Sequence, residues 1–221
     1  MTICLVSCLL MASTSVFPQI SNTPGTVYKD GFSYHEISPA IESRITGSSY
    51  RENPDISLDD LRYVKIKYVD FEGNEKSGEL IVNRRIAKDI AEIFYELYKH
   101  EYPLEEVSLI DNYGASDEKS MEANNTTSFN YRKITGSSSL SRHACGMAID
   151  INPQINPYVK GNTVLPANGK AYAQRDEKKC TGKYASAMIQ RGDFIYTLFK
   201  KHGFSWGGDW NSLKDYQHFE K

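Results

Sequence analysis

The stretch that most constrains this chain is residues 141–153, Ser-Arg-His-Ala-Cys-Gly-Met-Ala-Ile-Asp-Ile-Asn-Pro. Its second half alternates between apolar and small or polar residues, the period of a half-buried β-strand, and the apolar set is Met147, Ile149 and Ile151. Asp150 therefore points to the opposite face, and we expect its carboxylate to lie in a cleft and not in the core. Gly146 allows the chain to turn between His143 and this strand.

The end of the chain supplies a second pair of polar groups, Asp215 and His218. A spacing of three places the two side chains on the same side of a helical or tightly turned segment. Together with His143 and Asp150 they make two imidazoles and two carboxylates. Three protein ligands, an open fourth position for water and a nearby base are the parts of a catalytic zinc site. The sequence therefore predicts one zinc ion per chain.

The pattern Ser-x-His-x-x-Gly-x-Ala-x-Asp, followed by a late Asp-x-x-His, resembles the zinc D-Ala-D-Ala carboxypeptidase and L-Ala-D-Glu endopeptidase family, the class M15 peptidases. The resemblance covers roughly residues 60 to 221. It implies a zinc metallopeptidase that hydrolyses peptides of bacterial peptidoglycan. It also implies a role for each matching residue: His143, Asp150 and His218 as zinc ligands, Asp215 as general base and Arg132 as electrophilic helper.

The expected fold is α+β, an antiparallel sheet with helices on one side, similar to the zinc fold of Hedgehog domains and D-Ala-D-Ala peptidases. Alternating residues 63–69, turn residues and then residues 78–82 predict a hairpin. Apolar residues at helical spacing predict a helix that Asn83 caps and Pro103 closes. A second helix is expected over residues 186–201.

A chain of 221 residues is long enough for one domain with a core of its own. We expect a signal-like leader in residues 1–19, an irregular arm or linker in residues 20–60, and the zinc peptidase domain in residues 61–221. The leader contains an apolar run too short to span a bilayer, which resembles a secretory signal. This favours export to the periplasm, the cell envelope or the outside. Residues 5–8, Leu-Val-Ser-Cys, also resemble a lipoprotein box, which would make Cys8 a lipidated membrane anchor.

The charges of the chain are mixed in sign. Lys and Arg number 26 and Asp and Glu 28, for a formal net charge of -2. No stretch concentrates enough Lys and Arg to neutralise a phosphate backbone, which argues against nucleic acid as a partner. The substrate should be small or neutral, or held locally by one arginine.

Several residues near the motif have more than one interpretation. The Ser141 hydroxyl can bind a ligand or a peptide carboxylate, or serve only in a turn. Trp206 and Trp210 can wall the substrate pocket or belong to the core. Asp209 is the substitute acid if Asp215 is not the base.

Two other functions compete with a zinc peptidase. One is a Ser141, His143 and Asp150 triad, but it has no sign of a nucleophile elbow and leaves Asp215 and His218 without a role. The other is a non-catalytic, zinc-stabilised binding module of the same fold, as in Hedgehog domains. The presence of both Asp215 and Arg132 favours an enzyme.

The two cysteines beyond the leader leave alternatives open. In an oxidising compartment Cys145 and Cys180 can form one disulfide, or they can be two separate, partly buried thiols. Cys145 as a zinc ligand is a third possibility, although its position between His143 and Asp150 would point it away from the face that those two share.

Overall fold

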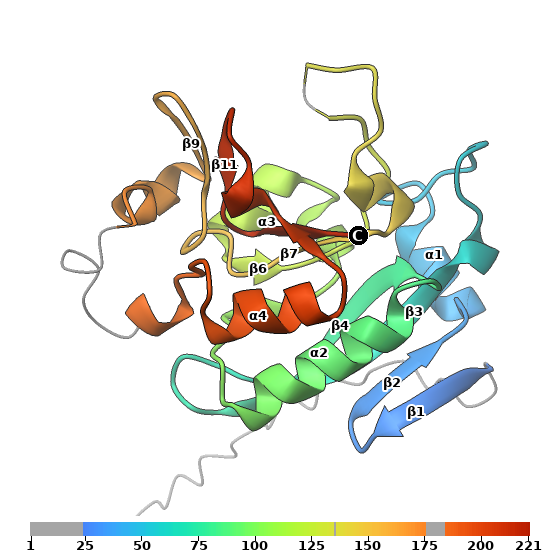
Figure 1. Cartoon of the computed structure of the whole chain (residues 1–221). Coiled ribbons are helices and arrows are strands. Elements are labelled where there is room, and N and C mark those ends of the chain that lie inside the picture. Colours follow the sequence, from blue (N-terminus) through green and yellow to red (C-terminus); the bar gives the residue numbers. More distant parts are fainter. Residues whose placement is uncertain (1–23, 135, 176–183) are drawn as a thin grey trace, which may run out of the picture.

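The computed structural model describes residues 24–134, 136–175 and 184–221. These residues form a mixed fold of antiparallel sheets and a few helices, in agreement with the predicted α+β class (Figure 1). The predicted leader, Cys8 and Cys180 lie outside the described residues. Within those residues, no helix has the length and apolar character needed to cross a membrane.

A four-stranded antiparallel sheet forms one half of the molecule, in the order β1-β2-β3-β4. Its strands are β1 (Gly25–Lys29), β2 (Phe32–His35), β3 (Leu61–Val69) and β4 (Glu75–Asn83). β3 and β4 pair along their whole length, from Leu61 opposite Asn83 to Val69 opposite Glu75. The hairpin predicted from the alternating pattern is therefore confirmed.

The stretch before β3 is not the irregular arm that the sequence suggested. It contains β1, β2 and the helix α1 (Pro39–Ile45), and β2 pairs with β3. The Ser38 side chain caps α1 by accepting a hydrogen bond from the amide of Ile41, and Pro39 suits the first helical turn. The predicted boundary at residue 61 therefore cuts through one continuous sheet.

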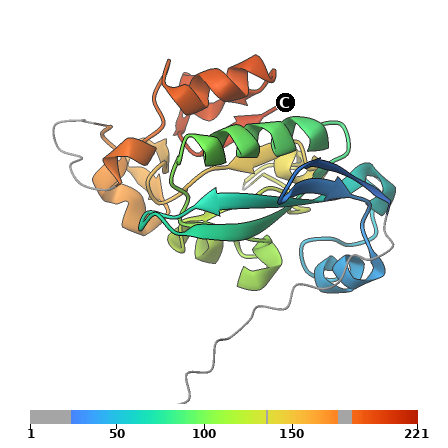
Figure 2. The ribbon, with the colours of Figure 1, turned by 90° about the horizontal axis from the view of Figure 1, so that it is seen from below.

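Both faces of the hairpin are covered. Val64 and Ile66 pack with α2 (Ala87–Lys99), whereas Tyr63 and Ile81 pack with α1 on the opposite face. Figure 2 shows α2 and α4 (Phe194–Lys201) on one side of the sheet and α1 and α3 (Asp117–Glu122) on the other. The helices thus lie on both sides of the sheet, and the expectation of one side was wrong.

The two predicted helices exist but begin later than expected. α2 starts after Ile86, and the Asn83 side chain instead accepts a hydrogen bond from the amide of Arg85 at 3.0 Å. α4 starts after Asp193, whose side chain caps it. Gly192 has a φ of +88°, which interrupts any helix between residue 186 and that cap.

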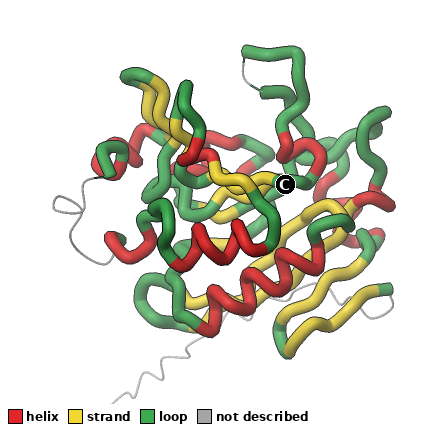
Figure 3. The backbone as a smooth tube through the Cα atoms, in the orientation of Figure 1, coloured by secondary structure: helices red, strands yellow, loops and turns green. Residues whose placement is uncertain are grey.

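Three small sheets make up the other half, where loops and turns join very short strands (Figure 3). One has the order β10-β12-β7, the second β11-β8-β9, and the third pairs β5 with β6 in parallel. Their strands are β5 (Glu106–Val107), β6 (Asn125–Thr126), β7 (Ala148–Asp150), β8 (Tyr158–Lys160), β9 (Thr163–Leu165), β10 (Ser205–Trp206), β11 (Lys214–Asp215) and β12 (His218–Glu220).

One hydrophobic core joins the two halves. Ile149 and Ile151, on and just after β7, and Phe219 of β12 are fully buried in the same cluster as the α2 side of the hairpin. Gly146 makes the join possible, because it has a φ of +65° and an added Cβ would lie only 2.7 Å from the amide nitrogen of Asn83. The turn that Gly146 was predicted to allow is therefore present, and it seats β7 against the end of β4.

A partly buried ion pair ties α1 to the hairpin, and its loss should be measurable. The Glu79 carboxylate is bound by the Arg44 guanidinium at 2.6 and 2.9 Å and by the Tyr63 hydroxyl at 2.5 Å. Arg44→Ala leaves this carboxylate without a counter-charge, so we expect urea denaturation to show a loss of about 2–3 kcal/mol in the free energy of unfolding. The matched control is Arg84→Ala, which removes an exposed pair with Asp60 and should cost less than about 1 kcal/mol. Equal losses would contradict this assignment.

Candidate metal centre

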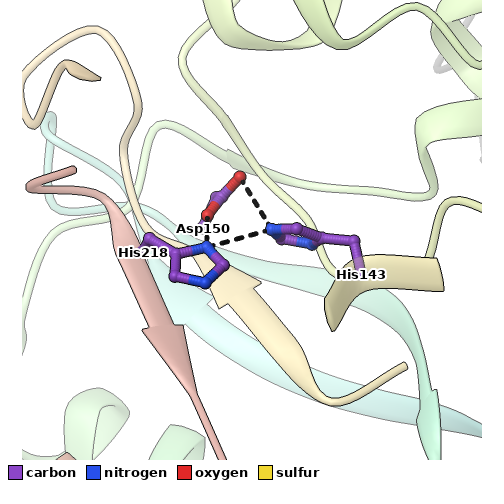
Figure 4. A group of neighbouring side chains, drawn as sticks. All are labelled: His143, Asp150 and His218. Carbon is purple, nitrogen blue, oxygen red and sulfur yellow. Dashed lines mark hydrogen bonds and ion pairs between the residues drawn. The ribbon is translucent and has the colours of Figure 1, made fainter. Parts of the chain in front are cut away.

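The pairing of β7 with β12 brings two of the predicted ligands together. In this antiparallel pair His218 stands directly opposite Asp150. Side chains opposite one another in such a pair have Cβ atoms about 5 Å apart. The His218 Nδ1 atom consequently lies 3.1 Å from Asp150 Oδ1 (Figure 4).

His143 reaches the same point from a short turn. It lies in the 3₁₀ turn η3 (Arg142–Cys145), which Ser141 caps by accepting a hydrogen bond from the His143 amide at 3.2 Å. The ring donates from Nδ1 to the carbonyl oxygen of Ser128 at 2.6 Å. A carbonyl oxygen can only accept, so a neutral His143 ring carries a lone pair on Nε2. That atom lies 3.2 Å from His218 Nδ1 and 3.3 Å from Asp150 Oδ2.

The other side of His218 faces a carboxylate. Its Nε2 lies 3.1 Å from Oε2 of Glu220. A neutral His218 ring that donates there carries its lone pair on Nδ1, the nitrogen that faces His143 and Asp150. When both rings are neutral, two nitrogen lone pairs and one carboxylate converge, with ligand atoms within 4.8 Å of one another. Two imidazoles and a carboxylate form a donor set that fits zinc.

The charges at the centre act strongly on one another when no metal balances them. Burial lowers the pKa of His218, but its hydrogen bonds to Asp150 and Glu220 outweigh burial and raise the pKa to about 10. For Asp150 burial raises the pKa, yet the neighbouring charge and hydrogen bonds of His143 and His218 bring it well below its usual range. The metal-free centre therefore holds a His218 imidazolium paired with an Asp150 carboxylate.

Asp215 approaches the same group from a different sheet. It ends β11, whereas His218 begins β12, so a turn and not a helix joins the two residues. Gly207 packs against it so closely that an added Cβ would lie 2.5 Å from the Asp215 carbonyl oxygen. Burial raises the pKa of Asp215 to about 6, opposed by the charge of His218 and a hydrogen bond from Gln217. A carboxyl with this pKa can take up and release a proton near neutral pH.

Arg132 lies beside the ligand turn but is held by another residue. Its carbonyl oxygen accepts a hydrogen bond from the Ser141 amide at 3.1 Å, so its backbone runs next to η3. The guanidinium forms an ion pair with Asp117 at the start of α3. Within the described residues, Arg132 makes no hydrogen bond or ion pair to any of the three converging side chains.

The other three predicted contact residues have different environments. The Ser141 hydroxyl caps η3, as expected if it serves only in a turn. It bonds to neither ring nitrogen of His143, so the Ser141, His143 and Asp150 triad is not formed. Trp206 is 4% exposed and donates from Nε1 to the Tyr216 carbonyl at 2.8 Å. Trp206 therefore lies in the core, which is the second of the two interpretations of this residue. The partly exposed Trp210 ring lies 5.4 Å from the His218 ring.

Two contributors to the centre, Glu220 and Ser128, were not predicted from the sequence. Glu220 follows His218 by two residues on a strand, so both side chains fall on the same side, and this spacing could have identified it. The Ser128 carbonyl had no sequence signal, because any residue type offers the same backbone oxygen.

A cavity of 680 Å³ lies on the other side of η3, and Arg142 and Cys145 are among its lining residues. Residues three apart share one face of a 3₁₀ turn, so these two face the cavity while His143 faces the centre. Cys145 is consequently not a member of the converging group. The disulfide with Cys180 and the two separate thiols both stay predictions, because Cys180 lies outside the described residues.

A second group of ligand-type side chains is already balanced by lysines. Asp89, Glu92 and His202 lie close together between α2 and the end of α4. However, Lys221 lies 2.8 Å from Asp89 and Lys88 lies 3.6 Å from Glu92. We read this group as a network of ion pairs and assign it no metal.

The fold and the site define a mixed α/β protein with a buried His-Asp-His group that can bind a metal ion. A family model described as D-alanyl-D-alanine carboxypeptidase matches residues 135–221, less than half of the chain. The match includes His143, Asp150, Asp215 and His218 and excludes Arg132. This match supports the resemblance to the M15 peptidases and a peptidase of the carboxypeptidase family. Neither the curated proteins nor the solved structures that were searched gave a match.

The metal-free centre makes a specific prediction about stability and pH. A raised histidine pKa stabilises the folded state fully below the ordinary value near 6.5 and loses this effect as pH rises to the folded value of about 10. With a chelator present, the free energy of unfolding of the wild type relative to His218→Ala should fall between pH 7 and 10, with a slope approaching about 1.4 kcal/mol per pH unit. Chemical denaturation at several pH values measures this difference. A difference that does not change with pH would rule out the imidazolium pair.

Proposed function

We propose that this protein is a zinc-dependent metallopeptidase that hydrolyses peptide bonds in the stem peptides of bacterial peptidoglycan. The observation that carries the proposal is the convergence of His143 Nε2, His218 Nδ1 and the Asp150 carboxylate inside the segment that matches a carboxypeptidase family. Asp215 is near enough for the charges of these three groups to act on its carboxyl. The bond cleaved is either the terminal D-Ala-D-Ala bond or the L-Ala-D-Glu bond within the stem.

The proposed cofactor is one zinc ion per chain, held by His143, Asp150 and His218. Bound there, zinc would lower the pKa of a water molecule and polarise the carbonyl of the scissile bond. The three residues contribute charge and direction: two neutral imidazoles fixed from behind by Ser128 and Glu220, and one carboxylate with a depressed pKa.

Asp215 is the proposed general base and then general acid. As a carboxylate it accepts a proton from the attacking water, and as a carboxylic acid it returns that proton to the leaving amine. Its pKa of about 6 leaves it mostly ionised at neutral pH and still able to hold the proton during the reaction. The close packing of Gly207 fixes the backbone of Asp215 while it does so.

Arg132 is the proposed stabiliser of negative charge on the substrate. A guanidinium placed near the carbonyl oxygen strengthens its interaction as the oxygen becomes an anion. The ion pair with Asp117 restricts the orientations that this side chain can take. Trp210, beside His218, is the proposed aromatic contact for the substrate.

Peptidoglycan as the substrate agrees with the export predicted from residues 1–19. A periplasmic, envelope-bound or secreted location, with Cys8 as a possible lipid anchor, is therefore part of the proposal. The alternative is a non-catalytic, zinc-stabilised binding module of the same fold. We prefer the enzyme because a partly buried acid with a raised pKa near the ligands is typical of a catalytic site and is not needed in a purely structural metal site.

Metal content and wall digestion together test the proposal. We expect about one zinc per wild-type chain by elemental analysis, and new free amino groups in digested peptidoglycan, because the donor set is that of hydrolytic zinc. His143→Ala should lose both. Product masses distinguish release of D-Ala from cleavage between L-Ala and D-Glu. Zinc without cleavage of any wall peptide would favour the binding module, and a wild type without zinc would refute the site.

The base assignment has its own test. Asp215→Asn keeps the shape of the side chain but removes its basicity, so kcat should fall by about 10²- to 10⁴-fold while zinc stays bound. The matched control is Asp209→Asn, since Asp209 is paired with Arg191 at 2.6 Å and should change kcat by only about twofold. Full activity in Asp215→Asn, or a larger loss in Asp209→Asn, would transfer the role to Asp209.

A further inference from the structure

We infer that Glu220 is a positioning residue that orients His218 and keeps its Nδ1 atom available for a metal ion. The inference rests on the proposed function, because it assigns a task to Glu220 only if His218 binds a metal. The metal centre then depends on a carboxylate, that of Glu220, which does not itself bind the metal.

The geometry gives Glu220 direct access to the back of the His218 ring. The two residues are two apart on β12, so their side chains leave the same side of the strand. Across the sheet Glu220 lies opposite Ala148 of β7 and Ser205 of β10, two small residues that leave it space. Its Oε2 atom lies 3.1 Å from His218 Nε2. Among the described residues, this carboxylate bonds to His218 and forms no ion pair with a lysine or arginine.

The need for Glu220 follows from the position of Asp150. The Asp150 carboxylate lies 3.1 Å from Nδ1 of His218, so it attracts the ring hydrogen to the nitrogen that has to face the metal. An acceptor of equal charge at the same distance on the Nε2 side removes this bias. Because one ring nitrogen is fixed by the hydrogen bond that the other makes, Glu220 directs the hydrogen to Nε2 and fixes the plane of the ring.

The His143 ring is oriented in the same way, by a hydrogen bond on the nitrogen away from the metal, but its acceptor is weaker. Its Nδ1 hydrogen is taken by the Ser128 carbonyl, which leaves Nε2 for the metal. The two histidines thus use opposite nitrogens, and each is fixed from behind. A hydrogen bond to a carboxylate is stronger than one to a neutral carbonyl, so Glu220 should matter more than a typical backbone acceptor.

The test measures metal release from the loaded protein. Zinc or cobalt is bound to the protein, excess chelator is added, and the rate of metal release is followed. Because the experiment starts from the metal-bound state, the protonation of the metal-free site does not affect the measured rate. We expect Glu220→Ala to release metal about 10- to 100-fold faster, the range typical of such outer hydrogen-bond partners. Glu220→Gln should lie in between, since its amide oxygen still accepts. The visible spectrum of bound cobalt should change in Glu220→Ala and be largely restored in Glu220→Gln.

The controls separate positioning from folding. Ser205→Ala alters the neighbouring strand opposite Glu220 without touching His218 and should leave the release rate and cobalt spectrum unchanged. If Glu220→Ala does not fold, Glu220→Met replaces it in the test, because methionine keeps the length of the side chain but cannot accept the hydrogen bond from His218. Glu220→Met should release metal as fast as predicted for Glu220→Ala. A wild type that binds no metal refutes the proposed function. A wild type that binds metal, with a folded alanine or methionine variant that releases it at the wild-type rate, refutes only the role of Glu220.

Discussion

The candidate centre depends on one pairing, that of β7 with β12. Each strand is three residues long, yet their register alone sets His218 opposite Asp150. If β12 were shifted by one residue along β7, His218 and Asp150 would point to opposite faces of the sheet. The site therefore exists only in this register. Phe219 and Ile149, opposite each other and fully buried, resist such a shift because it would expose them. The polar centre is thus held in place by the apolar face behind it.

A second layer of hydrogen bonds holds the ends of this pair. On one side Thr127 exchanges two backbone hydrogen bonds with Asp150. On the other, the Lys221 amide donates to the Met147 carbonyl and the Arg142 guanidinium donates to the Lys221 carbonyl. Arg142 precedes His143, so the turn that carries one histidine also anchors the strand that carries the other. Burying charged groups is costly unless they are paired, and here the surrounding chain supplies a partner for each.

The sequence predicted the ligand group better than its surroundings. The alternation around Asp150 is a local pattern, and the structure confirms it with Ile149 and Ile151 buried and the Asp150 side chain 13% exposed. The edge strand β1 is almost wholly exposed and shows no apolar alternation, so its own pattern did not indicate a strand. The signals for β2 were its alternating residues and the Asp30-Gly31 turn before it, and these were overlooked. Trp206 and Trp210 looked alike in sequence, but only tertiary packing could show that Trp206 lies in the core. The partners of Arg132 and of the histidine rings could not be predicted for the same reason, because they come from distant segments or from the backbone.

The separation of the ligands along the chain has a thermodynamic consequence. His143 and Asp150 are near neighbours in sequence, but His218 lies 68 residues beyond Asp150. Closing a loop of this length costs conformational entropy. The packing of the core offsets this entropy loss, so the loop is already closed before a metal ion binds. An ion that prefers the complete group therefore binds the native chain far better than the unfolded one and shifts the folding equilibrium by mass action. The availability of metal would then help determine how much of this protein survives heat and proteolysis, apart from any role in chemistry.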